Sequence, residues 1–527
     1  MKLPVQNDKI TTPEKHAKLE GLQSSGDLNI YKIEVDVVII GSGAGGSLAA
    51  YELSRAGFRV LMLEEGSYFH PGHFKTDEVY SLSRFYRDSG FQMSENNYLS
   101  VFQGKTLGGS TTVNYKTIAY PRNNIFDDWE KIFGISGYRE NETQDLVDEI
   151  ESFLKFEVPS EDLLGPNQSI LLPVLRDLNL PFYYYTALSH KCQGLGRCSL
   201  GCPINAKQSM YMNYIPAALD FGAKIFTQMR VLKIEDGIKK RVLAEFVKDP
   251  HEPPISGTIN RMEVFAKTVI VSAGPIESPA LLIRSGLGNK SVGTNLKLHP
   301  GATVMGVFES KIDMHRGIPQ LLRIDGESNS KYWIDTWNIR PSSYSRLLPY
   351  NGISLFNTLQ KFSYSASAVV QVRDGVKGKT LGRVDWRSGE KKIFYELSPE
   401  DEKQLLMGIR QLCRIYSHAG AKYIVLPFLN RTDPLPVNSA DSFDWILNDP
   451  SHRKQLILNS IHPHGSISLS SNSSLGGVDK NLKLYGLENL YVMDSSVLPT
   501  SLGVGPQLMT MIVVLKSLKK LIKTLKK

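Results

Sequence analysis

The feature that most constrains the fold lies near the start of the chain, where an apolar run ends in a cluster of glycines. Residues 35–40 read VDVVII, a β-branched segment typical of a strand buried on both faces of a parallel sheet. Gly41, Gly43 and Gly46 follow at G-x-G-x-x-G spacing. The first glycine allows a tight turn, the second lets the backbone approach a pyrophosphate, and the third brings a helix against the strand. This segment predicts the start of a dinucleotide-binding βαβ unit.

The residues that follow complete this unit. Leu48, Leu53 and Ala56 have the spacing of a helix that faces a sheet, and a second strand is predicted over residues 59–63. Glu64 ends this strand about 20 residues beyond the glycines, where a carboxylate would accept hydrogen bonds from an adenosine ribose. On its own, Glu64 is equally a solvated strand end. The pattern predicts a dinucleotide site without distinguishing FAD from NAD.

Further segments give nearly the whole chain a resemblance to a known family. Residues 104–114, GKTLGGSTTVN, resemble the first signature of the glucose-methanol-choline (GMC) oxidoreductases, which are FAD enzymes that oxidise alcohols. Residues 272–279, SAGPIESP, resemble the second signature, and residues 292–300 match the stretch that follows it. Residues 489–499, NLYVMDSSVLP, resemble the C-terminal FAD motif of the family. Together with the glycine cluster, these motifs occur in the order typical of the family.

The resemblance implies an α/β fold, α+β overall, with a discontinuous Rossmann-like FAD-binding domain and a substrate domain built on an antiparallel sheet. A chain of 527 residues is also too long for a single hydrophobic core. The expected division is an N-terminal extension over 1–31, an FAD-binding domain over 32–120, 190–310 and 455–527, and a substrate-binding domain over 121–189 and 311–454.

The FAD-binding residues are predicted from these motifs. Glycines at 108 and 109 leave backbone N–H groups free to point into a pocket, although an ordinary glycine turn would have the same sequence. Asp494 follows the apolar run LYVM and therefore lies at the carboxyl end of a strand, where open α/β sheets bind ligands. The predicted set is Gly41, Gly43, Gly46, Glu64, Gly108, Gly109, Ser110, Asn114, Val231, Ala273 and Asp494.

Val113 occupies the position at which some GMC members carry a histidine bonded to the flavin ring. Valine cannot form that bond. The resemblance therefore implies that FAD is bound noncovalently.

The predicted catalytic residue is His462, in the segment IHPHG over residues 461–465. Oxidation of an alcohol requires a base for the hydroxyl proton while a hydride leaves carbon for flavin N5, and a histidine suits that role. The family motif places this histidine against the flavin. His464 would line the cavity or form a hydrogen bond within the turn, and no catalytic role is assigned to it.

One position departs from the family. GMC members usually carry an asparagine or a histidine before the proline of the final motif, and Gly505 occupies that position here. Glycine has no side chain to stabilise a developing alkoxide. Either Gln507 or His464 would replace the missing group, or the chemistry is different.

Cys192, Cys198 and Cys202 lie within eleven residues of one another, far from Cys413. No export signal supports a disulfide framework. Three thiolates would suffice for a three-iron cluster, as in some GMC sugar dehydrogenases, but not for common four-ligand sites. The run CSLGCPINAKQS over 198–209 also resembles long-chain alcohol oxidase-like and sterol oxidase-like members, which need no cluster. A structural loop is the preferred interpretation, no metal ligand is assigned, and the cluster remains an alternative.

The remaining features bear on location and partners. Residues 1–31 have no apolar core of signal-peptide length, and no run of about 18 apolar residues suggests a membrane span, so a cytoplasmic protein is expected. The net charge of +8 is not gathered in a nucleic-acid-binding module, and no nucleic-acid partner is expected. The basic tail over 511–527 has apolar residues at helical spacing. It predicts either a helix packed on the cofactor domain or peripheral membrane contact.

Three functions remain open at this point. The preferred one is FAD-dependent oxidation of an apolar or sterol-like alcohol. The second is a sugar or polyol dehydrogenase that passes electrons through an iron–sulfur cluster at the cysteines. The third, suggested by Gly505, is a flavin-binding protein with little alcohol oxidation. The tyrosines at 183–185 would line a cavity or belong to core or surface, and the sequence names neither the alcohol nor the electron acceptor.

Overall fold

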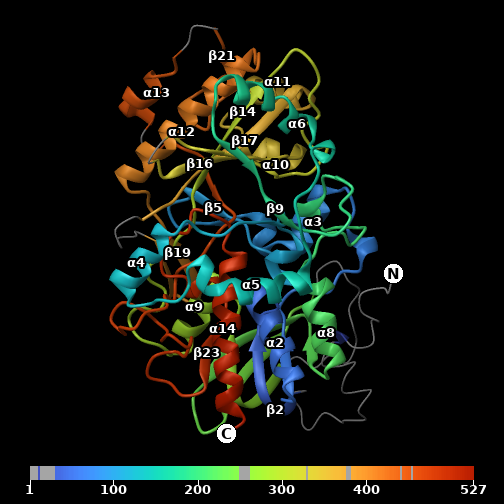
Figure 1. Cartoon of the computed structure of the whole chain (residues 1–527), viewed down its shortest axis with the longest axis vertical. Coiled ribbons are helices and arrows are strands. Elements are labelled where there is room, and N and C mark those ends of the chain that lie inside the picture. Colours follow the sequence, from blue (N-terminus) through green and yellow to red (C-terminus); the bar gives the residue numbers. More distant parts are fainter. Residues whose placement is uncertain are drawn as a thin grey trace.

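The structure is a computed structural model that describes residues 10–11, 30–248, 261–327, 330–375, 382–438, 442–452 and 455–527. Its two large β-sheets lie one above the other along the long axis of the molecule (Figure 1). The predicted N-terminal extension, residues 1–31, lies mostly outside the described residues.

The lower sheet is the predicted Rossmann-like sheet. Its strands run in the order β1-β10-β3-β2-β13-β12-β11, with β23 beside the end of β13. Strand β2 pairs in parallel with β3 and β13, and Ile40 lies opposite Leu63 and Val271. The strands are β1 (Ile10–Thr11), β2 (Ile30–Ile40), β3 (Val60–Leu63), β10 (Lys224–Phe226), β11 (Met229–Glu235), β12 (Lys240–Phe246), β13 (Arg261–Val271) and β23 (Leu490–Val492).

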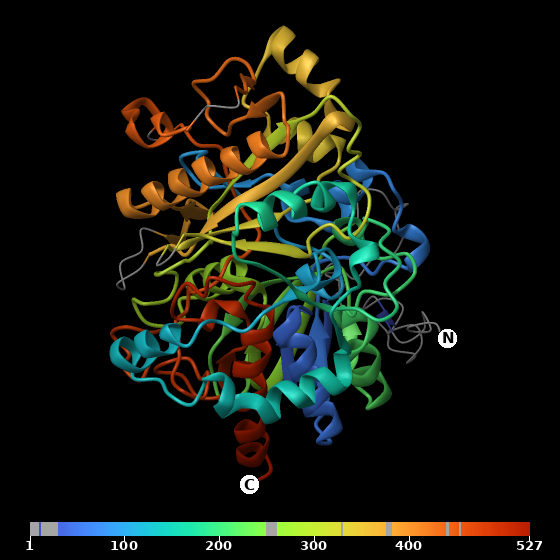
Figure 2. The same ribbon diagram turned by 45° about the horizontal axis from the view of Figure 1, so that its top comes forward.

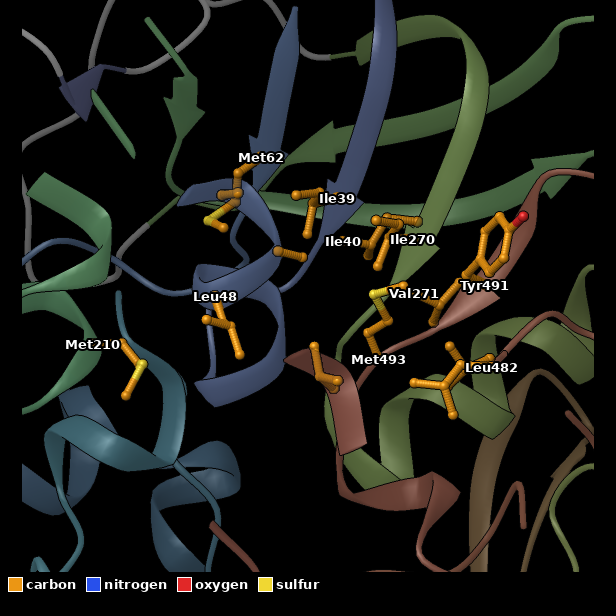
Figure 3. Packing of buried hydrophobic residues seen from close by; sticks show 14 of the residues in the cluster. Ile39, Ile40, Leu48, Met62, Met210, Ile270, Val271, Leu482, Tyr491 and Met493 are labelled. Carbon is orange, nitrogen blue, oxygen red and sulfur yellow. The ribbon is translucent and has the colours of Figure 1, made fainter. Parts of the chain in front are cut away.

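The VDVVII run forms the end of β2, and its last three residues are almost completely buried because helices and neighbouring strands cover both faces. Helix α2 (Ala44–Arg55) begins directly after Gly43, as predicted, and buries Leu48 and Leu53. Figure 3 shows Leu48 of α2 near Ile39 and Met62, with Ile270, Tyr491 and Met493 further along the same core. This packing brings the first glycine loop beside the ends of β13 and β23.

The C-terminal helix α14 (Gln507–Leu525) packs against α2 and α5 (Glu140–Leu154). Of the predicted apolar stripe, Leu515 and Leu518 are at most 1% exposed, whereas Ile522 and Leu525 are partly buried against the same core. The structure therefore has the packed form of the tail over most of α14. None of the helices within the described ranges is long and apolar enough to span a bilayer.

The upper sheet is mainly antiparallel and runs in the order β4-β5-β22-β14-β17-β16-β15-β8, extended by β20 and β21. Its strands are β4 (Gln92–Met93), β5 (Leu99–Val101), β8 (Phe182–Tyr184), β14 (Gly301–Val307), β15 (Leu322–Asp325), β16 (Tyr332–Thr336), β17 (Ser365–Val372), β20 (Tyr423–Val425), β21 (Leu435–Pro436) and β22 (Leu458–Ser460). Helix α12 (Pro399–His418) covers one face by packing on β14, β16 and β17.

The remaining elements surround these two layers (Figures 1 and 2). The helices are α3 (Glu78–Phe85), α4 (Asn124–Phe133), α6 (Pro166–Ser169), α7 (Leu172–Asp177), α8 (Tyr214–Asp220), α9 (Gly274–Arg284), α10 (Pro341–Leu347), α11 (Gly352–Leu359) and α13 (Trp445–Asn448). The small strands are β6 (Thr117–Ile118), β7 (Phe156–Glu157), β9 (Thr186–Leu188), β18 (Arg383–Arg387) and β19 (Glu390–Phe394).

The chain crosses between the layers more often than the sequence suggests. Strands β4, β5, β14 and β22 belong to the upper sheet although they fall within the ranges predicted for the FAD-binding domain. Strand β22 pairs with β5 in parallel and with β14 at Gly301. Because β22 leads directly into the 461–465 turn, this exchange places the predicted catalytic histidine between the two layers.

Candidate active site

One cavity of about 770 Å³ receives side chains from both layers. Most of the predicted cofactor and catalytic residues line it, although they are scattered over more than 450 positions. Gly46 and Gly108 do not line the cavity. The lining residues from the predicted set are Gly41, Gly43, Glu64, Gly109, Ser110, Asn114, Val231, Ala273, His462 and Asp494.

The glycines of the first loop have two different tasks. A Cβ added at Gly43 would meet no atom within 4 Å, so this backbone faces open space. A Cβ at Gly46 would lie 2.1 Å from the carbonyl oxygen of Gly41, and one at Gly45 would lie 1.8 Å from that of Met493. Gly43 therefore leaves room for a ligand, whereas Gly45 and Gly46 allow α2 to pack on the sheet.

Glu64 holds the glycine loop in place. Its carboxylate accepts hydrogen bonds from the backbone N–H of Ser42 at 3.0 Å, the Ser42 hydroxyl at 2.5 Å and the N–H of Gly66 at 2.7 Å. Burial raises the pKa of Glu64. Since a carboxylate offers about four acceptor positions, these contacts leave about one for the predicted ribose.

The adjacent residue, Glu65, was not predicted as a site residue but also lines the cavity. It pairs with Arg87 at 2.8 Å and with Arg230 at 3.0 Å. Burial opposes its ionisation, but these two guanidinium groups lower the pKa of Glu65 to about 2. The sequence signal was weak, because both arginines are distant from Glu65 in the chain.

Asp494 joins its own segment to helix α9 at the edge of the cradle. Its carboxylate accepts hydrogen bonds from the Gly274 N–H at 2.9 Å, the Ser278 hydroxyl at 2.5 Å and the Ser496 N–H at 2.8 Å. Gly274 and Ser278 belong to α9, and burial raises the pKa of Asp494. The predicted acid therefore fixes the start of α9 at the wall of the cavity.

The 104–114 motif lies directly against the glycine loop, because the Gly108 N–H donates to the Ser42 hydroxyl at 2.9 Å. The Ser110 hydroxyl accepts a hydrogen bond from the Gly104 N–H at 3.0 Å. The Asn114 side-chain amide donates to Oε1 of Gln507 at 2.7 Å, and the Lys116 N–H donates to Oδ1 of Asn114 at 3.1 Å. Both predicted polar side chains thus organise the loop that faces the cavity.

His462 lies where the two layers meet. Burial, together with the nearby charges of His464 and Arg323, lowers the pKa of His462 to about 3. Within the described residues its buried Nδ1 has no hydrogen-bond partner, while Nε2 lies 3.3 Å from the position of a Cβ built on Gly505. The imidazole is therefore neutral at physiological pH, and Gly505 leaves space beside Nε2.

Two further histidines pack against His462. The ring of His299 lies 5.5 Å from that of His462 and 4.7 Å from that of His464. Nδ1 of His464 lies 2.7 Å from the carbonyl oxygen of His462, and the Gly503 N–H donates to Nε2 of His299 at 3.1 Å. Neither His299 nor His464 lines the cavity. His464 thus forms the hydrogen bond within the turn, one of its two predicted roles.

Gln507 is the polar side chain nearest in sequence to the missing asparagine or histidine. It lines the cavity, and its Oε1 accepts a hydrogen bond from Asn114. Its buried Nε2 has no partner among the residues that the structure describes. An unpaired buried donor of this kind is costly unless a ligand satisfies it. The structure therefore offers Gln507, rather than His464, as the amide available to a bound group.

Asp374 and Arg323 hold the segments around His299 and Gly503 in place, and the sequence did not predict either residue. Asp374 accepts hydrogen bonds from the Leu298 and His299 N–H groups and from the hydroxyls of Tyr395 and Ser501, at 2.7–3.2 Å. Arg323 donates to the Gly503 carbonyl at 2.8 Å. Neither residue lies in a recognised motif, and their partners come from distant segments.

The upper layer supplies the wall opposite the cradle. Trp337 lies on this wall and donates through Nε1 to the hydroxyl of Tyr115 at 2.6 Å. Gln320 and Ser343 line the same cavity. The tyrosines at 183–185 are not among the lining residues.

The cysteine loop lies behind the 104–114 motif. Cys192, Cys198 and Cys202 are free thiols that border a small cavity of about 20 Å³. Lys207 donates through Nζ to the carbonyl oxygens of Thr112, Asn114 and Cys198 at 2.5–3.1 Å. Over the described ranges of the chain, no group of three or more His, Cys, Asp or Glu residues is placed to hold a metal ion. The loop thus braces the cofactor wall.

Two sequence profiles described as GMC oxidoreductase match residues 82–301 and 380–513, about two thirds of the chain in total. A profile described as an NAD(P)-binding Rossmann-like domain matches residues 39–87.

Among sequence relatives, an uncharacterized GMC-type oxidoreductase of Mycobacterium tuberculosis is 29% identical, over 90% of this chain and 74% of its own. A long-chain-alcohol oxidase of Arabidopsis thaliana is 26% identical, over 95% of this chain and 69% of its own.

Among solved structures, formate oxidase of Aspergillus oryzae has a TM-score of 0.70 at 17% identity, covering 94% of this chain and 99% of that one. Pyridoxine 4-oxidase from Mesorbium loti has a TM-score of 0.67 at 16% identity, covering 92% and 98%. These two structures share the fold. With both family profiles matched around one cavity, the chain belongs to the GMC oxidoreductase family, flavin enzymes with a Rossmann-like FAD-binding domain.

Proposed function

We propose that this protein is an FAD-dependent oxidoreductase that oxidises the CH–OH group of an apolar alcohol, with His462 as the base. The observation that carries the proposal is the position of His462, a neutral imidazole on the same cavity as the nucleotide cradle. Family membership supports the flavin chemistry, and the alcohol and the role of His462 are the proposal.

The residues present fit FAD. The open space over Gly43 suits a pyrophosphate, and the N-terminus of α2 directs its partial positive charge there. Val113 lines the wall and offers no nucleophile, so we propose that FAD is held noncovalently.

When bound, FAD supplies the acceptor for the hydride. His462 takes the hydroxyl proton at Nε2, because Nδ1 is buried and Nε2 faces the space left by Gly505. Gln507 lies two residues after Gly505. Its Nε2–H₂ group would take the place of the missing side chain and stabilise the developing alkoxide by donating a hydrogen bond.

The character of the substrate is proposed from the opposite wall. Trp337, Leu200 and Phe102 bring apolar surface to the cavity, and the Trp337 N–H is already satisfied by Tyr115. The Arabidopsis relatives are named long-chain-alcohol oxidases. Both observations support an alcohol with an apolar body.

The iron–sulfur alternative lacks a supporting observation. The described cysteines do not form a metal-binding group, and Lys207 and its carbonyl partners give their loop a structural task. A fructose dehydrogenase large subunit of Gluconobacter japonicus is 27% identical over only 57% of the chain. We therefore do not propose a sugar dehydrogenase.

The test is anaerobic reduction of the purified flavoprotein by alcohols of increasing chain length, followed by the loss of the flavin absorption bands. The proposal expects bleaching by apolar alcohols and little by glucose or fructose. Absence of bleaching by every alcohol would favour a flavin-binding protein with little oxidation. FAD should appear in the supernatant after acid precipitation, and FAD that stays with the polypeptide would refute noncovalent binding.

A further inference from the structure

His299 lies next to the proposed base in a backbone conformation that its residue type rarely adopts. It precedes β14, is fully buried, and has a φ of +45°. A residue with a side chain keeps a left-handed backbone only where its surroundings hold it there. The carboxylate of Asp374 gives that support, because it accepts hydrogen bonds from the N–H groups of Leu298 and His299 at 3.0 and 3.2 Å.

The imidazole ring of His299 is held on two sides. Its Nε2 accepts a hydrogen bond from the Gly503 N–H at 3.1 Å, and the ring of Trp333 packs against it at 5.2 Å with an interplanar angle of 88°. Arg323 links these two partners, because its guanidinium lies 4.8 Å from the centre of the Trp333 ring and donates to the Gly503 carbonyl at 2.8 Å. We call His299, Trp333, Arg323 and Gly503 the His299 clamp.

The clamp requires His299 to be neutral. An imidazole nitrogen accepts a hydrogen bond only when it carries no proton, so the Gly503 contact places the single proton of the neutral ring on Nδ1. Burial, together with the adjacent rings of His464 and His462, lowers the pKa of His299 well below its ordinary value. The hydrogen bond and the surroundings of the ring therefore favour the same protonation state.

The clamp packs directly against His462. The rings of His299 and His462 lie 5.5 Å apart at an interplanar angle of 86°, a common geometry for two aromatic rings in contact. On the side of Nε2, His462 faces Gly505, which has no side chain to hold the imidazole ring. The side-chain support of the His462 ring therefore comes from His299.

The same clamp fixes the loop over residues 503–507. Both backbone groups of Gly503 are hydrogen-bonded to it, the N–H to His299 and the carbonyl to Arg323. Two residues further along is Gly505, and the loop then leads into Gln507 at the start of α14. A shift of Gly503 would thus move the amide of Gln507 relative to His462.

We infer that His299 is a positioning residue that sets the geometry between the base His462 and the amide donor Gln507. It supports the first through ring packing and the second through the Gly503 N–H. His299 does not line the cavity, so it acts through these residues and not on the substrate. The effect on the reaction rests on the proposed function, whereas the placement of the His462 ring does not.

The test variant is His299→Leu, because leucine is close to histidine in volume but has no acceptor for the Gly503 N–H. In the FAD-loaded full chain, flavin reduction at saturating alcohol should slow roughly 10²-fold, the cost of misplacing a reacting group by about 1 Å. The dissociation constant of the alcohol and the FAD content should not change, because His299 lies outside the cavity. His299→Gln should restore most of the rate, since its side-chain oxygen accepts a hydrogen bond from Gly503.

Ile334→Ala is the matched control for a loss of stability. Ile334 is fully buried in β16 and follows Trp333 in the strand, so its side chain points to the opposite face of the sheet. This variant should lower the unfolding temperature without slowing flavin reduction at saturating alcohol. Equal rate losses in Ile334→Ala and His299→Leu would overturn the inference.

Crystal structures of the FAD-loaded variants give a readout that needs no substrate. The His462 ring should be displaced or disordered in His299→Leu and should keep its wild-type position in His299→Gln. His299→Ala is the second variant if the leucine variant does not fold, and it should show the same displacement.

An unmoved His462 ring in the leucine or alanine variant would overturn the inference. So would a weaker alcohol affinity with an unchanged limiting rate, because His299 would then act on the substrate site. If no alcohol is oxidised but the His462 ring moves as described, the proposed function fails and the positioning role stands.

Discussion

Gly43→Val is expected to remove FAD without unfolding the protein. The valine Cβ would meet no atom within 4 Å, and the backbone at φ −67° and ψ −167° suits any residue. Replacing glycine stabilises by about 0.4–1 kcal/mol through the unfolded chain, while valine is a poor helix N-cap and costs a similar amount. The free energy of unfolding of the apoprotein should therefore change by less than about 1 kcal/mol.

The effect on the holoprotein is different, because the side chain enters the space proposed for the pyrophosphate. At an FAD concentration of about 100 times Kd, the wild type gains about 2.7 kcal/mol. For a chain of 527 residues this corresponds to a rise in Tm of about 2–3 °C. Differential scanning calorimetry with and without FAD should show this rise in the wild type and none in the variant.

Gly46→Val is the matched control, because its Cβ would lie 2.1 Å from the Gly41 carbonyl and should destabilise the fold itself. A Gly43→Val protein that keeps its full complement of FAD would refute the assignment of the cradle. An apoprotein destabilised by several kcal/mol would show instead that Gly43 is a packing glycine.

Two further changes test other parts of the structure. The pKa of His462 in the folded protein is lowered to about 3, from an ordinary value of 6.5. Between these two pH values the unfolded chain binds a proton at this histidine and the folded protein does not. The free energy of unfolding therefore decreases as the pH falls from 6.5 towards 3. In that pH window, His462→Gln should reduce the pH dependence of the apoprotein's unfolding free energy by up to about 1.4 kcal/mol per pH unit, as measured by urea titration. An unchanged pH dependence would contradict the burial of a neutral imidazole. Leu518→Ala should cost about 2–5 kcal/mol in chemical denaturation because Leu518 is fully buried in α14, whereas a cost below about 0.5 kcal/mol would mean that the helix does not pack as described.

The cofactor domain was predictable because its signals are local. The β2 strand, the glycine loop and α2 follow one another in the chain, and each obeys a short-range rule of burial or backbone conformation. Gly43 could be assigned to a ligand and Gly46 to packing from spacing alone, and the structure gives each glycine those surroundings. Asp494 at the end of β23 followed from the rule for strand ends.

The layer boundaries and the supporting residues were not predictable in this way. Strand β22 is three residues long, and its membership of the upper sheet depends on pairing with β5, about 360 positions earlier. Asp374 has no motif, because its partners are backbone groups at 298 and 299 and hydroxyls at 395 and 501. Such long-range hydrogen bonds leave no periodic pattern in a single sequence.

The tail shows how one pattern has two physical outcomes. Apolar residues at helical spacing with lysines between them suit a membrane surface and a protein surface equally well. The structure places Leu518 against the cofactor domain, where it is fully buried. Amphipathic spacing in α14 thus marked a protein contact.

The central claim is that His462 takes the hydroxyl proton on the cavity that holds FAD, and one measurement tests it most directly. The rate of anaerobic flavin reduction should be compared between the wild type, His462→Ala and His464→Ala, using the alcohol that bleaches the wild type. We expect His462→Ala to retain FAD and to be slowed by about 10²–10⁴-fold, the usual contribution of a positioned base, and His464→Ala to lose less. A near-normal rate in His462→Ala, or a larger loss in His464→Ala, would contradict the account.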